Sequence, residues 1–166
     1  MKRIISVLLL LTLALTFVSC KNKQDDIETP VLFYYCTQSA HKDSKMPVFE
    51  AEIRDATSFD GDLLSILNLY FKGPATDELA TPFPSGTHVL SVIREDTDIV
   101  LTISSSFGEL TGLDLSIACA AVSMTIIELT QCESVIICAQ DMLLDGAEQI
   151  VISANMLYMD DIIPTS

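Results

Sequence analysis

The chain has 166 residues, which is enough for one domain of ordinary size and scarcely enough for two. Its formal net charge of −14 becomes −16 when the two positive charges of Lys2 and Arg3 are set aside. Binding to nucleic acid requires clustered Lys and Arg, and so does adsorption to anionic lipid, so this balance argues against both.

The first 19 residues have the pattern of a secretory signal peptide. Lys2 and Arg3 form a basic start, and the apolar run of residues 4–18 is shorter than the roughly 20 residues that span a bilayer. Ser19-Cys20 at its end resembles the bacterial lipobox, whose Cys is diacylated and becomes the new N-terminus. We therefore expect lipidation of Cys20 and anchoring to the extracytoplasmic face of the cell membrane. An ordinary signal peptide cut near Ser19 and an uncleaved anchor are the alternatives.

Residues 20–30 are expected to form a flexible tether between the lipid and a folded domain. From Lys21 to Pro30 only Ile27 is apolar, so this segment cannot bury enough surface to offset the cost of ordering it. We expect residues 31–166 to form a single domain with a C-terminal appendage.

Two short segments predict a strand hairpin at the start of the domain. Residues 31–36 are apolar and rich in aromatic side chains, which favours a buried strand. Residues 48–54 partly alternate between apolar and polar side chains, which suits a second strand that pairs back with the first.

The best-defined predicted element is a helix that ends before Gly73. Ser58 or Asp60 is expected to cap its N-terminus. Gly73 suits the left-handed residue after a helix, and Pro74 prevents continuation. Four apolar side chains recur at helical spacing and predict one buried stripe. They are Leu63, Ile66, Leu67 and Tyr70.

An irregular connector is expected over residues 75–87, with Phe83 packed back into the core. A polar cluster at residues 95–98 then separates two alternating segments, residues 89–94 and 99–104, as the turn of a hairpin does.

The last third of the chain predicts a second helix followed by strands. Residues 113–129 form this helix, and their small side chains allow it to pack closely on a sheet. Residues 135–139 are expected as a buried strand, Asp145-Gly146 as a turn and residues 150–152 as a short edge strand. The βαββαβ-type order predicts an α/β (α+β) fold, a mixed β-sheet with two helices packed on one face.

Several segments, taken in their order along the chain, resemble the GerMN domain family of sporulation and spore-germination lipoproteins. In chain order they are residues 67–74, 83–87, 89–92 and 100–107, followed by the second helix and Glu133-Ser134-Val135. The resemblance covers roughly residues 31–139. It implies a ring-building-motif-like domain that is non-catalytic, binds no cofactor and acts through contacts with envelope or sporulation-complex proteins. Self-association is left open.

Four cysteines follow Cys20, namely Cys36, Cys119, Cys132 and Cys138. No C-x-x-C pair is present, so a zinc or redox site lacks its usual spacing. Cys36 and Cys138 lie in predicted strands that can face each other. We favour small buried thiols over a disulfide, because free cysteine is among the most often buried residues.

Other candidate site residues have simpler interpretations. His41 and His88 are the only histidines, and neither Ser nor Cys occurs in a recognisable nucleophile turn. A catalytic triad is therefore not expected. Acidic groups can suggest calcium, but Glu95 to Asp98 lacks the Gly and distal Glu of an EF-hand loop, and a solvated hairpin tip and a helix cap explain the groups better. These groups are Asp55/Asp60/Asp62, Glu95/Asp96/Asp98 and Asp160/Asp161.

The sequence therefore predicts a lipid-anchored, extracytoplasmic, non-catalytic protein-interaction module that assists sporulation, germination or assembly of cell-envelope complexes. The alternative is a small cell-envelope enzyme such as a cell-wall hydrolase, which would need a cleft lined by His or carboxylate groups. A solute-binding lipoprotein suits so short a domain poorly, because such proteins usually close two lobes around a ligand.

Overall fold

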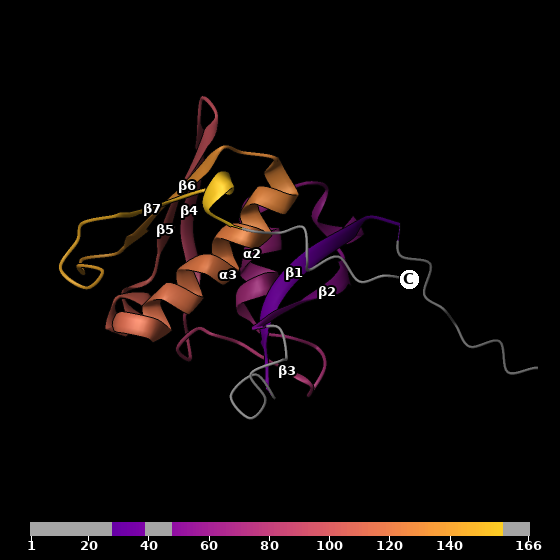
Figure 1. Ribbon diagram of the computed structural model, residues 1–166. Coiled ribbons are helices and arrows are strands. Elements are labelled where there is room, and N and C mark those ends of the chain that lie inside the picture. Colours follow the sequence, from indigo (N-terminus) through magenta and orange to yellow (C-terminus); the bar gives the residue numbers. More distant parts are fainter. Residues whose placement is uncertain (1–27, 39–47, 158–166) are drawn as a thin grey trace, which may run out of the picture.

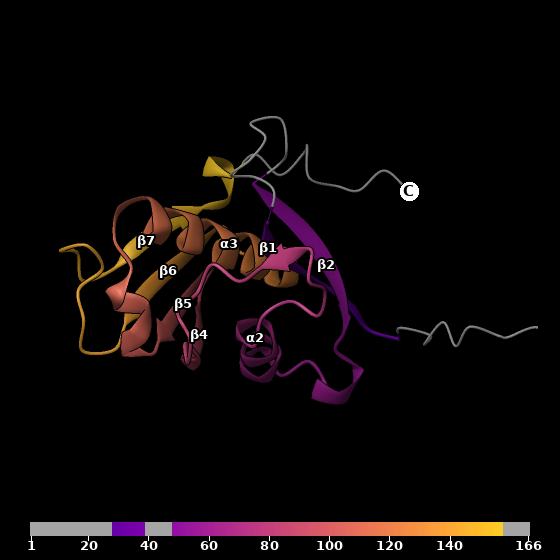
Figure 2. The same ribbon diagram turned by 90° about the horizontal axis from the view of Figure 1, so that it is seen from below.

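The computed structural model describes residues 28–38 and 48–157, in which helix α3 (Gly112–Thr130) lies between two β-sheets (Figures 1 and 2). One sheet has the strand order β2-β1-β3, and the other has the order β4-β5-β6-β7. The predicted signal peptide and Cys20 lie outside the described residues, as does most of the tether.

The three-stranded sheet contains the predicted N-terminal hairpin. Strand β1 (Pro30–Thr37) pairs antiparallel with β2 (Phe49–Asp55), with Leu32 opposite Ile53. A third strand, β3 (Leu79–Ala80), pairs with the end of β1 and was not predicted, because two residues are too few to show a periodicity.

Helix α2 (Leu63–Phe71) ends as predicted, whereas its N-terminal cap differs from the expectation. Gly73 has φ +95°, which is the left-handed conformation that the sequence predicted. The cap is Asp62, whose side chain accepts a hydrogen bond from the Ser65 N–H at 3.2 Å, and not Ser58 or Asp60. Asp60 instead adopts a left-handed φ of +47° after a short 3-10 turn (Thr57–Phe59), so the helix begins after it.

An aromatic cluster joins β1, α2 and the connector (residues 72–88), which links α2 to β4. The Tyr70 ring centroid lies 5.2 Å from that of Phe33, 5.0 Å from that of Tyr35 and 5.3 Å from that of Phe83. Phe83 in turn lies 6.2 Å from Phe107, which is fully buried. The predicted return of Phe83 to the core is therefore confirmed.

The four-stranded sheet mixes both directions of pairing. Strands β4 (Val89–Glu95) and β5 (Asp98–Ile103) form the predicted hairpin. The chain then passes through a 3-10 helix (Ser105–Glu109) and α3 before β6 (Ser134–Ala139) pairs parallel with β5. The predicted edge strand is β7 (Ile150–Ser153), antiparallel to β6, and a short 3-10 helix (Ala154–Met156) follows it.

Helix α3 forms much of the core. Every residue from 121 to 127 is buried, and the helix contacts β1 of one sheet as well as β6 and β7 of the other. By length and composition α3 is apolar enough to cross a membrane. Its burial between the two sheets identifies it as a core helix.

The mixed α+β class and the two helices are as predicted, but the strands form two sheets and not a single sheet. Hydrogen bonds at Tyr34 in β1 explain the difference. Its backbone N–H donates to Thr125 Oγ1 of α3 at 3.0 Å, and its carbonyl accepts from the Tyr70 hydroxyl of α2 at 2.7 Å. Side chains from both helices thus replace a neighbouring strand along this edge of β1.

The expected packing of both helices on one face is found in the mixed four-stranded sheet: α2 contacts β4, α3 contacts β6 and β7, and alternate residues of β5 and β6 are buried on one face. In the three-stranded sheet the two helices lie on opposite faces. Phe33 and Tyr35 of β1 contact Tyr70 of α2. Leu32 and Cys36, which point the other way, line cavities that α3 bounds.

Candidate interaction surface

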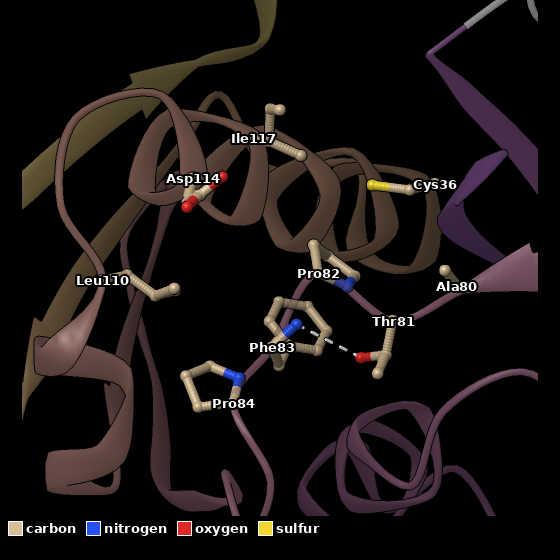
Figure 3. Close-up of a pocket in the computed structure, with 9 residues that line it drawn as sticks. All are labelled: Cys36, Ala80, Thr81, Pro82, Phe83, Pro84, Leu110, Asp114 and Ile117. Atoms are coloured by element: carbon tan, nitrogen blue, oxygen red, sulfur yellow. Dashed lines mark hydrogen bonds between the residues drawn. The ribbon is translucent and has the colours of Figure 1, made fainter. Parts of the chain in front are cut away.

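The connector borders α3 and leaves a cavity of about 380 Å³ beside it (Figure 3). Leu110, Asp114 and Ile117 lie along one side, and residues 82–84 of the connector lie on the other. The remaining lining residues come from the ends of two strands and the start of the connector's proline-rich part. They are Cys36, Ala80 and Thr81.

A second cavity of about 500 Å³ lies against the same part of the connector. It shares Thr81, Phe83 and Pro84 with the first cavity, and it is otherwise bounded by residues 71–72 and 85–87. The proline-rich part of the connector therefore contributes to two hollows, and its shape determines both.

Hydrogen bonds hold the connector near both of its ends. The Ala75 N–H donates to Glu52 Oε1 at 2.8 Å, and Glu52 also forms an ion pair with Arg54 at 3.4 Å. Thr87 donates from its hydroxyl to the Pro84 carbonyl at 2.7 Å, and its Oγ1 lies 3.2 Å from Ser106 Oγ. A fixed connector keeps the cavities preformed, which lowers the ordering cost of binding.

The chemistry of the cavity beside α3 suits contact better than reaction. Its walls are mostly apolar, with the carboxylate of Asp114 and the thiol of Cys36 as the two ionisable groups. Burial raises the pKa of the Cys36 thiol, so the nucleophilic thiolate is scarce at neutral pH. An apolar hollow beside one carboxylate can accept an apolar side chain next to a cationic one.

His88 is exposed just before β4, and its ring Nδ1 lies 2.9 Å from the Gly86 carbonyl oxygen. Nearby hydroxyls, which sequence reasoning missed, bond to each other and to the backbone. Ser104 Oγ lies 3.0 Å from Ser106 Oγ and accepts from the His88 backbone N–H at 3.1 Å. The run Ser104-Ser105-Ser106 was the available signal. These bonds join the connector to the 3-10 helix and do not pair the His88 ring with a nucleophile. His41 lies outside the described residues.

The four cysteines of the described residues are free thiols, as the sequence favoured. Cys119 and Cys132 are buried, and Cys36 and Cys138 are half-buried. Cys36 and Cys138 lie in different sheets, in β1 and β6, and α3 packs against both strands. Burial raises the pKa of the Cys119 thiol to about 12, which makes this thiol inert.

The acidic groups take local structural roles where the structure describes them. Asp55 accepts hydrogen bonds from the Thr57 hydroxyl at 2.5 Å and from the Thr57 N–H at 3.0 Å, and these bonds lower the Asp55 pKa. Asp62 caps α2. Asp96 adopts φ +51° in the β4–β5 turn. Among residues 28–38 and 48–157, no three His, Cys, Asp or Glu side chains gather to hold a metal ion. Asp160 and Asp161 lie beyond the described part.

Comparison with known families gives a match over most of the domain. The model of the Germane family, described as "Sporulation and spore germination", matches residues 32–145. The chain belongs to the Germane family. This confirms the resemblance to GerMN domains that the connector and the β4–β5 hairpin predicted. No curated protein matched the sequence.

One solved structure shows the same fold for this Germane-family chain. The tandem GerMN domains of the sporulation protein GerM from Bacillus subtilis match with a TM-score of 0.53 and 19% identity. The match covers 73% of this chain and 43% of that one, so the present chain spans less than half of its length. A putative lipoprotein from Clostridium perfringens matches with a TM-score of 0.42 and 17% identity, over 76% of this chain and 89% of that one.

Proposed function

We propose that this Germane-family protein is a lipid-anchored, extracytoplasmic, non-catalytic interaction domain that assists assembly of sporulation, germination or other cell-envelope complexes. The observation that carries the proposal is the family match over residues 32–145, whose description names sporulation and germination. The fold shared with domains of a sporulation protein is consistent with this role.

The preformed cavities support a role in binding. Proline-rich backbone and apolar side chains shape them, and within the described residues the one histidine ring contacts a carbonyl and no thiol or hydroxyl. Such a surface offers shape and one carboxylate to a partner, whereas hydrolysis would need a nucleophile paired with a base.

The N-terminal sequence supports the location. Two acyl chains on Cys20 would hold the protein stably at the membrane, and the polar residues 21–30 would separate the domain from the lipid. The strongly acidic domain would gain little from contact with anionic lipid headgroups, so the lipid would provide the attachment.

Replacement of Cys20 tests the anchor. In cells that produce the protein, Cys20→Ala is expected to abolish labelling with a fatty acid and to release the protein from the membrane fraction. Cys36→Ala removes a thiol of the folded domain and is the matched control, which should keep both the label and the membrane location. A Cys20→Ala protein that stays labelled and membrane-bound would contradict the proposal.

A further inference from the structure

Three large apolar side chains are exposed at the N-terminal end of α3. Leu113, in the first turn of the helix, is 71% exposed. Met142 and Leu143, in the loop between β6 and β7, are 41% and 55% exposed. Figures 1 and 2 both show this loop beside the start of α3. Large exposed apolar side chains on neighbouring segments, unlike ones scattered singly, mark binding surfaces.

The packing of Gly108 fixes the loop against the segment that leads into α3. A Cβ atom added at Gly108 would lie only 2.5 Å from the Met142 Cβ, so the two backbones approach as closely as a glycine allows. The Gln140 N–H also donates to the Ile103 carbonyl at 2.8 Å. The three apolar side chains are therefore presented by neighbouring, connected segments.

Exposed carboxylates accompany these apolar side chains. They belong to Glu109, Asp114 and Asp141. We call the surface formed by Leu113, Met142, Leu143 and these three acidic residues the α3 tip. The sequence from residue 95 to the end contains no Lys, Arg or His, so no cationic side chain of this region neutralises the α3 tip.

The α3 tip continues into the cavity beside the connector. Asp114 belongs to the α3 tip and also lines that cavity, together with Leu110 and Ile117 (Figure 3). Leu113 and Ile117 are four residues apart on α3, so they are neighbours on the helix surface. A segment bound over the α3 tip can therefore place one of its side chains in the cavity of about 380 Å³.

The charge of the α3 tip decides among the classes of occupant. Anionic lipid and nucleic acid would be repelled. A second copy packed through the same surface would bring carboxylates against carboxylates, because a two-fold interface uses the same patch on both subunits. A basic segment with large apolar side chains complements both the charge and the apolar part of the α3 tip. Its cations pair with the carboxylates, and its apolar groups cover the two leucines and the methionine.

We propose that the α3 tip and the adjoining cavity bind a basic segment of an envelope protein, with a large apolar side chain of that segment seated in the cavity. This proposal rests on the proposed function as an interaction domain and adds its surface and the chemistry of its partner. The binding is charge-steered, so it weakens as the ionic strength rises.

Photo-crosslinking of the full chain in the cells that produce it tests the surface. A photoreactive amino acid replaces Leu113 or Leu143, and the matched control replaces Ile53, which is 54% exposed beside the C-terminal end of α3. We expect positions 113 and 143 to capture one protein through a segment that is rich in Lys or Arg and contains large apolar residues. Position 53 should not capture it.

Any other crosslinking result contradicts either the inference about the α3 tip or the proposed interaction function. Capture of a second copy, of lipid or of an acidic segment at positions 113 and 143 overturns the inference, and so does capture of a protein at position 53 alone. In that last case the proposed interaction function stands. Capture of no protein at any of the three positions overturns the inference, and if native electrophoresis also shows only a monomer, it overturns the proposed function too.

Charge removal tests the chemistry of the partner. The triple variant Glu109→Gln, Asp114→Asn and Asp141→Asn keeps side-chain shape, and Asn tolerates the left-handed φ of +55° at position 141. We expect crosslinking at position 143 to fall about tenfold. The matched control removes three exposed charges elsewhere, through Glu28→Gln, Glu50→Gln and Asp96→Asn. Equal urea midpoints of the two variants exclude unfolding as the cause, and equal crosslinking overturns the role of the carboxylates.

Discussion

At the scale of single residues, Tyr34 shows how an unpaired part of a strand is completed inside the core. Its backbone N–H and carbonyl bond to Thr125 Oγ1 and to the Tyr70 hydroxyl. The Tyr35 hydroxyl donates to the Tyr70 carbonyl at 2.8 Å, so a second bond crosses between β1 and α2. A buried peptide group without a partner costs more than the bond itself contributes, so these side chains stabilise the sheet edge.

Removal of the Tyr70 hydroxyl should therefore destabilise the protein. Tyr70→Phe keeps the ring packing of the aromatic cluster and leaves the Tyr34 carbonyl without this donor. We expect the free energy of unfolding to fall by about 1–3 kcal/mol, measured by urea denaturation. Tyr34→Phe, which keeps both backbone bonds, is the control and should cost less. Equal losses in the two variants would show that the Tyr70 bond contributes nothing specific.

A second residue-scale prediction concerns alkaline pH. Burial raises the pKa of the Cys119 thiol to about 12 from 9.0. Above pH 9.0 the unfolded chain loses this proton while the folded chain keeps it, so stability is fully present below that pH and declines as the pH approaches 12. The buried hydroxyl of Tyr70 also has a raised pKa, which acts in the same direction. We expect a lower urea midpoint at about pH 10.5 than at about pH 8. Cys119→Ala should show a smaller decrease, and an equal decrease would exclude Cys119 as a contributor.

At the scale of elements, the features encoded by neighbouring residues were predictable from the sequence, and those that depend on residues distant in sequence were not. The end of α2 at Gly73-Pro74 and the β4–β5 hairpin were predictable, because each is encoded by a few neighbouring residues. The division into two sheets was not, since it depends on Tyr70 and Thr125, which are distant from Tyr34 in sequence. The N-terminal cap of α2 is Asp62 and not the expected Ser58 or Asp60, because a short 3-10 turn precedes the helix.

Gly73 provides the test at this scale. A Cβ at this position would meet only ordinary contacts, 3.8 Å from the Thr81 Cβ, so the cost of a side chain lies in the backbone φ of +95°. We expect Gly73→Ala to lower the free energy of unfolding by about 1–2 kcal/mol. Gly73→Asn should lose less, because Asn adopts left-handed conformations more readily. If the two variants lose equal stability, the φ angle is not the cause.

At the scale of the molecule, the sequence predicted a binding role but not the place of a binding site. Composition and the absence of a nucleophile motif favoured a binding role, and residues 75–87 were expected as an irregular connector with Phe83 packed into the core. The cavity beside α3 was not predictable, because Cys36, Phe83 and Asp114 meet only when both sheets pack around the helix. Leu113 and Leu143 gave no sequence signal of exposure, since apolar residues usually indicate the core.

The extent of the cooperative domain gives the whole-molecule prediction. The core begins with β1 and reaches Leu157, which is partly buried against it. We therefore expect residues 28–157 to have the same urea midpoint as residues 21–166. A shorter chain of residues 28–149 lacks β7, so it loses the pairing of Ile152 with Val135 and the packing of Ile150.

This shorter chain should lose at least about 2 kcal/mol of unfolding free energy, because two partly buried isoleucines and an edge strand are removed. It also leaves β6, which contains the fully buried Val135 and Ile137, as an unprotected edge strand, so we expect the shorter chain to aggregate at high concentration in light scattering. A midpoint of residues 28–157 below that of residues 21–166 would instead show that flanking residues contribute to the stability of the domain.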